Sequence, residues 1–431
     1  MNVVVCVGYL DKHTRFFHKI YKSTQKNLRV RFVIHSIYPS GWLKKLIYLK
    51  RGYWIPAQAW WVSQRKKNTY KSIIKGKELY RNIDFSSLLK YHIKNSPKTN
   101  IEYLQIQSLA YIDIYEAQVK KLKPSLFLLL GDSRLSIECC VAVAKKHNIP
   151  IYYLEQGPNN TTIFNSQGVN AKWPIKSIPE IPKKANKEIK LPHLKTTYLR
   201  NPIFRGIDFL THYVLNGMYV YPPDLHQKKH GIRNKISKSI ITPNYQLDKD
   251  QSIFFLALQV DSDVNMIYHS PYFNNSFELL SSVYHSLPAN AKLIVREHPK
   301  QKGRYCNELY RFIENNQIIL DNKTPLQQLL ELANVVVVNN STVGIEALLK
   351  HKVLVVLGKA YYDFDEICLR IHNKNKLKDI LFKAQNKSVN KMAINGFLYN
   401  LFNNHLIEGD IASKKPIAAQ KIASIITKLL S

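Results

Sequence analysis

The chain has 431 residues, and its 63 Lys and Arg against 30 Asp and Glu give a formal net charge of +33. Because 45% of the residues are hydrophobic and only 22% are charged, the composition excludes a disordered polycation and predicts packed cores. At roughly 100–200 residues per domain, this length predicts two domains. No segment approaches the run of about 20 apolar residues that a membrane-spanning helix requires.

The positive charge is concentrated in the first hundred residues, where 21 Lys and Arg stand against 3 Asp and Glu. Four of the five tryptophans, Trp42, Trp54, Trp60 and Trp61, lie among these cations. Basic groups between indole rings suit an anionic membrane surface. The ordinary alternative is a solvated basic face with its tryptophans half in the core. The same composition could bind single-stranded nucleic acid by stacking and charge. No recognition module is recognisable, so we expect no nucleic-acid partner.

The first half reads as two strand–helix–strand units separated by an insertion. The first comprises Val3–Val7, Lys12–Thr24 and Val30–His35, and the second Ser125–Leu130, Leu135–Lys146 and Ile151–Leu154. Between them, the segment from 37 to about 100 is aromatic, basic and irregular, which indicates an insertion. The start lacks the basic region of a signal peptide. Five cysteines without metal-ligand spacing fit a reducing compartment, so we expect a cytoplasmic protein.

The second half alternates strands and helices more clearly, which predicts a doubly wound parallel sheet. The expected strands are Ile253–Gln259, Lys292–Arg296, Ile318–Leu320, Val335–Val338 and Val353–Leu357, and the helices between them are Phe277–Ser286, Tyr305–Asn315, Pro325–Leu332 and Thr342–Lys350. We therefore predict an α/β protein with a Rossmann-like domain over 1–175, a connection over 176–245, a second Rossmann-like domain over 246–410 and a C-terminal helix over 411–431. Two such domains are expected to face a cleft, with the ligand at the carboxyl ends of strands.

The most distinctive local pattern is a buried valine strand followed by Asn339-Asn340-Ser341-Thr342-Val343-Gly344 and a helix. Free N–H groups at Thr342–Gly344, with the hydroxyls of Ser341 and Thr342, predict an anion site for a phosphate. The alternative is an ordinary helix start capped by Ser341 or Asn340.

A second polar pattern, Arg296-Glu297-His298-Pro299, directly follows a strand. Arg and His at this position can bind a phosphate or diphosphate, while Pro299 ends the strand. Taken alone, such a histidine is more often part of a turn. Together with the Ser341 loop, it makes a phosphate clamp a reasonable prediction.

Carboxylates follow three further strands. Asp261 and Asp263 come after Gln259, where an Asp-x-Asp pair could hold a divalent cation, or one carboxylate could act as nucleophile or base. In the first half, Asp132 with Arg134, and Glu155 with Gln156, end two strands. Carboxylates at strand ends are candidate acids, bases or nucleophiles, although each could equally cap a helix.

Taken in chain order, these stretches resemble the bacterial capsule polysaccharide synthesis and export family, whose characterised members are β-Kdo glycosyltransferases that use CMP-Kdo. The resemblance covers about 125–365. It rests on Ile149–Gly157, Gln167–Ala171, Leu258–Asp263 with His269-Ser270, His298-Pro299, Asn340–Leu348 and Val355–Asp363.

The resemblance implies a GT-B-like pair of Rossmann domains, metal-independent chemistry and transfer with retention of configuration. It implies that His298, Pro299, Ser341, Thr342 and Gly344 form the CMP site, that Gln259 and Arg296 lie nearby, and that Glu346 reaches towards the ribose. Asp132, Arg134, Gln156 and Lys359 are expected to contact sugar or acceptor. The family keeps one Asp after its Gln-Val pair, at Asp263, and often has a second carboxylate where this chain has Gln156.

We therefore expect a peripheral enzyme on the inner face of the cytoplasmic membrane, which transfers Kdo from CMP-Kdo to a lipid-linked or glycan acceptor. Asp263 is the expected nucleophile and Glu155 the acid/base or a sugar-orienting group, and the reverse assignment is the main alternative. No cofactor or metal is expected. The alternatives are a transferase for another nucleotide sugar and a non-catalytic partner in capsule assembly or export.

Overall fold

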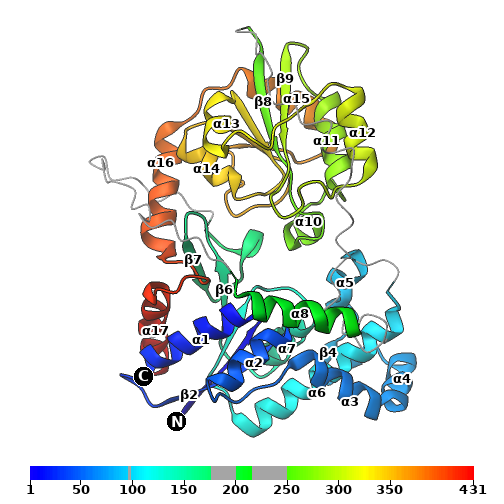
Figure 1. Cartoon of the computed structure of the whole chain (residues 1–431), viewed down its shortest axis with the longest axis vertical. Helices are drawn as coiled ribbons and strands as arrows, with labels where there is room; N and C mark the ends of the chain where they lie inside the picture. The colour runs from blue at the N-terminus through cyan, green and yellow to red at the C-terminus, as the bar shows by residue number, and fades with distance from the viewer. Residues whose placement is uncertain (96–98, 176–199, 216–249) are drawn as a thin grey trace. The chain divides into compact units, whose positions relative to one another are not determined.

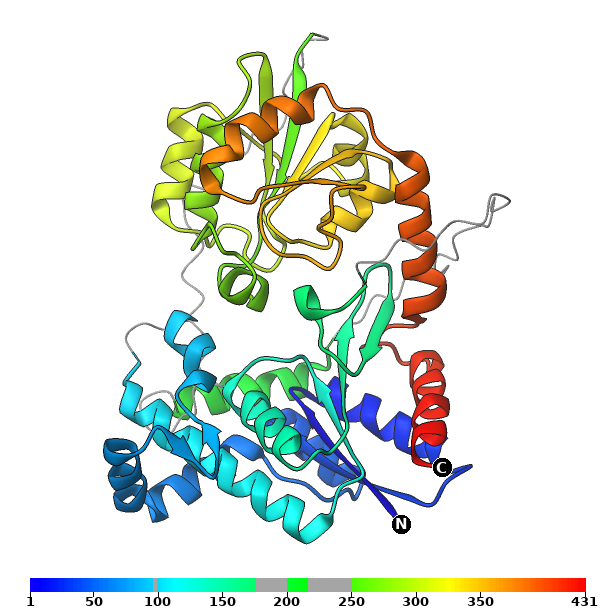
Figure 2. The same cartoon turned by 180° about the vertical axis from the view of Figure 1, so that it is seen from behind.

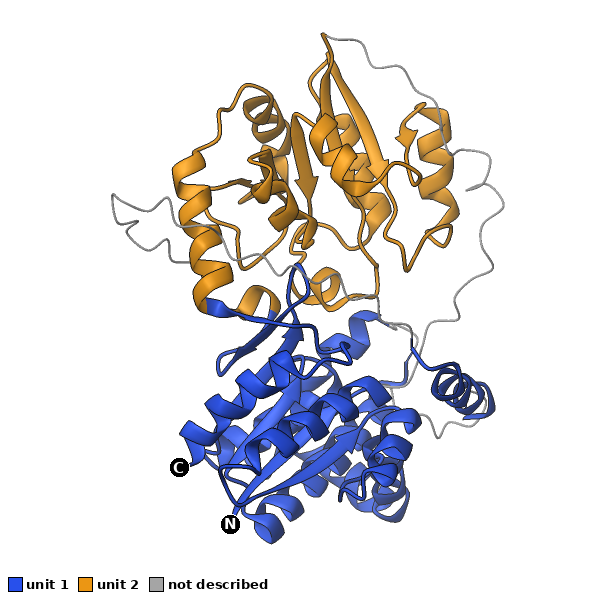
Figure 3. Ribbon diagram, turned by 60° about the vertical axis from the view of Figure 1, so that its left-hand side comes forward, with its two compact units in different colours: residues 1–169, 191–228, 405–431 blue, residues 170–190, 229–404 orange. Residues whose placement is uncertain are grey.

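The computed structural model describes residues 1–95, 99–175, 200–215 and 250–431, which form two compact units (Figure 3). Unit 1 contains Met1–Val169, the described residues 200–215 and His405–Ser431; unit 2 contains the described residues 170–175 and 250–404. Most of the expected connection over 176–245 lies outside the described residues.

Unit 1 is built on a six-stranded sheet in the order β14-β7-β6-β5-β1-β2. Its strands are β1 (Asn2–Gly8), β2 (Val30–Ser36), β5 (Leu126–Leu130), β6 (Ile151–Gln156), β7 (Thr161–Asn165) and β14 (Leu406–Glu408). The four strands from β6 to β2 are parallel, as the two predicted strand–helix–strand units require. The sheet is mixed, however, because β7 runs antiparallel to both β6 and β14.

Helices cover both faces of this sheet. On one face, α1 (Asp11–Thr24) and the C-terminal α17 (Ile417–Leu430) lie side by side (Figure 1). Both pack on the even-numbered side chains of β1 and β5. On the other, α6 (Ile101–Leu122) lies beside α7 (Leu135–Lys146), as the opposite view shows (Figure 2). The C-terminal helix therefore completes the core of unit 1, although it is far from that unit in the sequence.

The segment expected to be irregular is instead helical. It forms α2 (Pro39–Ile47), α3 (Ile55–Arg65), α4 (Lys67–Gly76), the hairpin of β3 (Leu79–Tyr80) and β4 (Ile83–Asp84), and α5 (Lys90–Asn95). Prolines in the first turn of α2 and of α3 suit a helix start, because that turn has no partner for their missing N–H. The prediction was wrong because these helices present aromatic and basic residues in place of a simple apolar stripe.

Residues 51–54 continue the sheet of unit 1 beyond its edge strand β2. Ile34 N–H donates to the Arg51 carbonyl at 2.8 Å, and Ser36 N–H donates to the Tyr53 carbonyl at 3.1 Å. Gly52 lies between them at φ +141°, where a Cβ atom would come within 1.8 Å of the Ile34 carbonyl oxygen. Only glycine allows this close approach of the two backbones.

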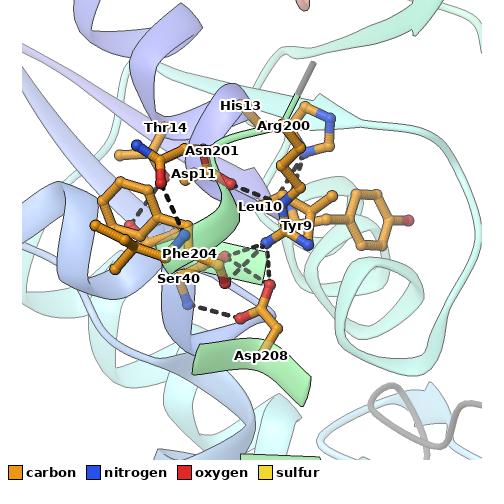
Figure 4. Close-up of polar contacts among 12 residues, drawn as sticks. Tyr9, Leu10, Asp11, His13, Thr14, Ser40, Arg200, Asn201, Phe204 and Asp208 are labelled. Carbon is orange, nitrogen blue, oxygen red and sulfur yellow. Dashed lines mark hydrogen bonds and ion pairs between the residues drawn. The ribbon is translucent and has the colours of Figure 1, made fainter. Parts of the chain in front are cut away.

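A buried ion-pair network fixes α8 (Pro202–Leu215) to unit 1 (Figure 4). The Arg200 guanidinium contacts Asp208 on α8 and donates to Asp11 of α1 at 3.0 Å and to the Ser40 hydroxyl of α2 at 2.8 Å. Asp208 in turn accepts from the Ser40 backbone N–H at 2.9 Å. Burial disfavours the Arg200 charge, but the two carboxylates outweigh it and raise its pKa. Three helices are thus held by one cation.

Unit 2 contains an all-parallel sheet in the order β10-β9-β8-β11-β12-β13. Its strands are β8 (Ser252–Ala257), β9 (Ala291–Arg296), β10 (Ile319–Leu320), β11 (Val335–Val338), β12 (Val353–Val356) and β13 (Leu369–Arg370). Each strand predicted in this half is present, although β8 ends two residues earlier than expected. Side chains of β11 are buried on both faces, as a central parallel strand requires.

The helices of unit 2 also lie on both faces of its sheet. The larger core cluster joins the strands to α11 (Ser276–His285), α12 (Asn307–Asn315) and α15 (Leu377–Gln385). On the other side, α13 (Leu326–Leu332), α14 (Val343–Leu349) and α16 (Lys391–Asn400) pack around β8, β11 and β12. The prediction of two Rossmann-like α/β units is confirmed.

His35 on β2 makes the stability of unit 1 dependent on pH. Burial lowers the pKa of His35 from 6.5 to about 4. The hydrogen bond to Gln118 partly opposes this shift, and the Lys45 charge adds to it. Below pH 6.5 the unfolded chain takes up a proton that folded His35 refuses, so the free energy of unfolding falls as the pH drops from 6.5 towards 4. At about 1.4 kcal/mol per pH unit, the loss from this residue approaches about 3 kcal/mol.

The replacement His35→Asn should remove that part of the pH dependence. Denaturant unfolding at pH 7, 5.5 and 4 measures it, with the other histidines titrating equally in both proteins. We expect the wild type to lose more stability than the variant between pH 7 and 4. Parallel curves for the two proteins would contradict this assignment.

Candidate functional site

In unit 2, the carboxyl ends of β8 and β11 are tied together by a pair of side-chain amides. Gln259 follows β8; its amide nitrogen donates to the Asn340 Oδ1 atom at 2.8 Å, and its amide oxygen accepts from the Asn340 backbone N–H at 3.1 Å. The Asn340 amide nitrogen donates to the carbonyls of Asn265 and His269. Gln259 therefore positions the Ser341 loop, using its amide oxygen and one amide N–H.

The two aspartates after β8 have different roles. Asp261 accepts from the Ser276 backbone N–H at 2.8 Å and its hydroxyl at 2.6 Å, and from the Gln301 amide at 3.2 Å. Both of its oxygens are thus committed to holding the loop. Asp263 is exposed and accepts from the Asn265 N–H at 2.9 Å, which caps the short helix α10 (Val264–Tyr268). Of the four carboxylate oxygens of Asp261 and Asp263, the second oxygen of Asp263 therefore remains available for chemistry.

The Arg296–Pro299 segment divides between structural and candidate binding groups. Arg296 contacts the Thr324 carbonyl, and buried Glu297 holds the following loop by accepting from Gly303 N–H at 2.9 Å. His298 is half-buried, and its Nδ1 atom accepts from the Lys300 N–H at 3.1 Å. Burial, with Lys300 adding and the Asp263 charge opposing, lowers the His298 pKa. Neutral His298 thus presents an Nε2–H donor near Asp263.

The start of α14 combines an exposed polar edge with a tightly packed interior. The Ser341 hydroxyl accepts from Val343 N–H at 3.3 Å, whereas Thr342 is exposed. Gly344 lies against Tyr362, because an added Cβ atom would be 2.6 Å from the Tyr362 hydroxyl and 2.7 Å from its ring, and this hydroxyl donates to the Ser341 carbonyl. Glu346 accepts from Gln327 at 2.8 Å, and burial raises its pKa. Ser341 is thus partly used as a cap, as the ordinary interpretation expects.

Lys359 adds a cation after β12. Its backbone N–H donates to the His269 carbonyl at 2.8 Å, while its side chain is exposed. Gly358 beside it has no room for a Cβ atom, which would lie 2.7 Å from the His269 carbonyl oxygen. His298 and Lys300 thus follow the carboxyl end of β9, Thr342 that of β11 and Lys359 that of β12, on loops fixed by hydrogen bonds. The sequence did not reveal that Asn340 links the loops after β8 and β11, because its partner Gln259 is 81 residues away.

Unit 1 has its own group of polar residues at the ends of β5 and β6. Glu155 is half-buried and accepts from the Gln156 N–H at 2.9 Å, and its second oxygen lies 3.7 Å from the position of a Cβ atom on Gly131. The Gln156 amide donates to Asp410 at 2.8 Å. Asp410 follows β14, so a carboxylate is present beside Gln156 although the chain lacks one at that position.

Arg134 has an unusual backbone for a non-glycine residue, with φ 93° and ψ 143°. Its guanidinium lies over two rings, 4.6 Å from the centroid of Tyr91 and 6.0 Å from that of Tyr9. Asp132 is buried nearby. Burial of Tyr153, and in second place the Asp132 charge, raise the pKa of Tyr153 to about 12. Tyr9 and Tyr91, which sequence reasoning missed, thus help to define this group.

The residues predicted for catalysis and binding therefore fall in both units. Unit 2 holds Gln259, Asp263, Arg296, His298, Pro299, Ser341, Thr342, Gly344, Glu346 and Lys359; unit 1 holds Asp132, Arg134, Glu155 and Gln156. Within the described ranges, no three His, Cys, Asp or Glu side chains are grouped as metal ligands. The roles assigned to these residues stay predictions.

A parallel sheet with polar loops at its carboxyl ends and helices on both faces defines unit 2 as a Rossmann-like α/β module. Residues 206–410 match the model of a family described as capsule polysaccharide biosynthesis protein. The resemblance to capsule polysaccharide proteins is thereby confirmed.

Two curated proteins illustrate this relationship. The chain is 29% identical over 151 residues to the capsule polysaccharide export protein KpsS of Escherichia coli, covering 32% of this chain and 38% of KpsS. It is 28% identical over 270 residues to the capsule polysaccharide modification protein LipB of Neisseria meningitidis serogroup A, covering 55% of this chain and 64% of LipB. The matched regions thus span less than two thirds of either relative.

Among the solved structures that the comparison finds is the β-Kdo 2,7 transferase KpsC of Thermosulfurimonas dismutans. It is 15% identical, aligns over 73% of this chain and 89% of that chain, and gives a TM-score of 0.40. No helix in the described ranges has the length and apolar character needed to cross a membrane.

Proposed function

We propose that the protein is a glycosyltransferase of capsule or related surface polysaccharide biosynthesis, which transfers Kdo from CMP-Kdo to a lipid-linked or glycan acceptor with retention. The observation that carries the proposal is the group at the strand ends of unit 2. There an available carboxylate, Asp263, lies within electrostatic reach of a neutral histidine, His298. The match over 206–410 supports a role in capsule polysaccharide biosynthesis.

In this proposal, the donor phosphate is bound by hydrogen-bond donors and cations. His298 offers its Nε2–H, Thr342 its hydroxyl, and Lys300 and Lys359 their exposed ammonium groups. Such donors stabilise negative charge as CMP departs. Because both oxygens of Asp261 are committed to hydrogen bonds, no Asp-x-Asp cation site is assigned and no metal enters the proposed reaction.

Retention implies two displacements. In the first, an Asp263 oxygen forms a bond to the anomeric carbon while the carbon–oxygen bond to phosphate breaks, and CMP leaves with the electron pair. In the second, the acceptor hydroxyl attacks that carbon, releases Asp263 and gives its proton to a carboxylate. We assign this last role to Glu155 of unit 1, with the reverse assignment of the two carboxylates as the alternative.

A donor panel tests the proposal directly. The purified protein is incubated with a lipid-linked or glycan acceptor and with CMP-Kdo, another CMP-linked sugar or a UDP-linked sugar, and released nucleotide is measured. We expect CMP release from CMP-Kdo that depends on the acceptor. Turnover of another donor but not of CMP-Kdo would leave a glycosyltransferase with a different substrate.

A non-catalytic partner in capsule assembly or export is the second candidate. It is favoured by Gln156, whose amide is paired with Asp410 where relatives of the resembled family often have a carboxylate. In cells, Asp263→Ala and Glu155→Ala variants separate the two functions. Unchanged capsule production in both would support the partner role, and loss in either would support catalysis.

We also propose that unit 1 docks on an anionic membrane through the C-terminal end of α2. Leu46, Ile47 and Leu49 are 43%, 62% and 92% exposed, and Lys44, Lys50 and Arg51 lie beside them. Apolar side chains flanked by cations bind anionic lipid surfaces by insertion and charge together.

Replacing Leu46, Ile47 and Leu49 by Ser should abolish flotation with phosphatidylglycerol liposomes. A matched variant with three exposed apolar residues of unit 2 replaced, Leu332→Ser, Phe382→Ser and Met392→Ser, controls for lost hydrophobicity. We expect only the α2 variant to stay in the soluble fraction. Equal flotation with neutral liposomes, or equal loss in both variants, would contradict docking on anionic lipid.

A further inference from the structure

A cavity of about 590 Å³ lies beside the edge strand of unit 1. Its walls come from β2, the 51–53 segment, α3 and α6, with Arg31, Tyr53, Gln58 and Lys121 among the lining residues. Cavities of this size accommodate small organic ligands. None of the residues predicted for catalysis or donor binding lines it.

The cavity is strongly cationic. Arg31, Lys45, Arg51, Lys66 and Lys121 line it, and of the described residues around it only Asp113 carries a carboxylate. That carboxylate is fully engaged, because it accepts from Lys66 and Tyr70 at 2.7 Å and from Tyr80 and Arg81 at 2.8 Å. Among the described residues, the side chains of Arg31, Arg51 and Lys121 form neither a hydrogen bond nor an ion pair. Three cations thus converge without compensating charge.

An aromatic hollow of about 490 Å³ adjoins the cavity and shares Tyr53 and Gln58 with it. Trp42, Trp54 and Trp61 form its other walls. Two of these rings are held in place: the Trp54 indole N–H donates to the Ile37 carbonyl at 2.9 Å, and the Tyr53 ring stacks on His35 with 5.5 Å between ring centroids. On Trp61, the Arg65 guanidinium lies 3.4 Å from the ring centroid. One face of Trp61 thus carries a cation and one face of Tyr53 the His35 ring, while both residues still line the hollow with Trp42 and Trp54.

We propose that the cavity and the hollow together bind an anionic oligosaccharide. The apolar C–H faces of sugar rings would pack on Trp61 and Tyr53, and sugar carboxylates would meet Arg31, Arg51 and Lys121. The concave shape favours this ligand over a lipid surface, because a bilayer presents a plane of headgroups to protruding groups such as those at the end of α2. The inference rests on the proposed function in that the ligand would be a charged glycan of the same polymer class.

The probe that tests this site is tetragalacturonate, a linear tetrasaccharide with four carboxylates, titrated into the full-length protein by calorimetry and by tryptophan fluorescence. We expect saturable binding, and none of uncharged maltotetraose. Arg31→Gln with Lys121→Gln should weaken binding by about tenfold or more, because each removes a charge-assisted contact. Trp61→Ala should weaken it by about fivefold through loss of ring packing.

Lys26→Gln with Lys421→Gln is the matched control, since it removes two exposed cations of unit 1 outside the cavity. It should bind like the wild type. Equal weakening in this control, or no binding of tetragalacturonate, would overturn the site. Two competition results would also overturn it. Either phosphatidylglycerol liposomes or oligothymidylate would displace the sugar, and the Arg31, Lys121 and Trp61 variants would lose affinity for that competitor.

The two proposals can fail separately. Sugar binding that depends on Arg31, Lys121 and Trp61 in a protein without donor turnover would reject the transferase and keep the site. Normal donor turnover without sugar binding would do the reverse.

Discussion

The variant Asp263→Asn is expected to fold like the wild type and to lose at least about 10³-fold in transfer rate. Asparagine is as good a helix cap as aspartate, so its side-chain oxygen can still accept from Asn265 N–H and hold α10. What it cannot do is form a glycosyl ester and leave again as a carboxylate. Loss of the rate without loss of stability would therefore report the chemical step.

Asp261→Asn is the matched control, two residues away on the same loop. In the wild type, one Asp261 oxygen accepts from the Ser276 N–H and hydroxyl, and the other accepts from the Gln301 amide. Asparagine has only one side-chain oxygen, so it cannot accept at both positions. One donor, on half-buried Gln301, then lacks a partner, at a cost of about 1 kcal/mol. This variant should melt earlier but turn over normally per folded molecule. If Asp261→Asn abolishes transfer and Asp263→Asn does not, Asp261 is the reacting carboxylate and Asp263 only a helix cap.

The largest effect on stability is expected from Arg200→Met. Removing this guanidinium leaves Asp11 and Asp208, both almost fully buried, without their cation (Figure 4). Breaking a buried pair in this way costs about 3–5 kcal/mol, since a charge stays in the interior without compensation. We expect α8 to detach from α1 and α2 before the rest of unit 1 unfolds.

Hydrogen exchange of the α8 amides measures that detachment, and urea unfolding measures the total loss. Lys350→Met is the control: it removes a 2.6 Å ion pair with the exposed Glu331, where the expected cost is about 0–1 kcal/mol. Unchanged protection of α8 in Arg200→Met would show that apolar contacts, and not the ion pair, hold this helix.

The sequence predicts unit 2 well because its strands are short apolar runs flanked by polar turns. Val335–Val338 coincides with β11 to the residue, since four valines fit a strand buried on both faces. The long helix α6 was not anticipated, because it buries residues around most of its circumference, including Gln107, Ser108 and Asp113, and so lacks a clear apolar stripe. The helices of 39–95 were missed for the related reason that aromatic and basic residues replace the usual pattern.

For the candidate site, local sequence indicates where polar groups lie but not what each one contacts. The strand-end positions of Asp263, His298 and Ser341 follow from the alternation of strands and helices. That Gln259 is consumed by Asn340, and Asp261 by Ser276, depends on contacts between distant segments. The basic, aromatic first hundred residues likewise divide, in space, into an exposed apolar tip on α2 and a cationic cavity beside β2.

A crystal structure of the protein with CMP bound tests the central claim most directly. We predict the CMP phosphate at the strand ends of unit 2, within hydrogen-bond distance of the His298 Nε2 atom and of the Ser341–Thr342 turn, with Asp263 facing the position of the departing sugar. A nucleotide bound elsewhere, or a phosphate that contacts neither His298 nor this turn, would contradict it.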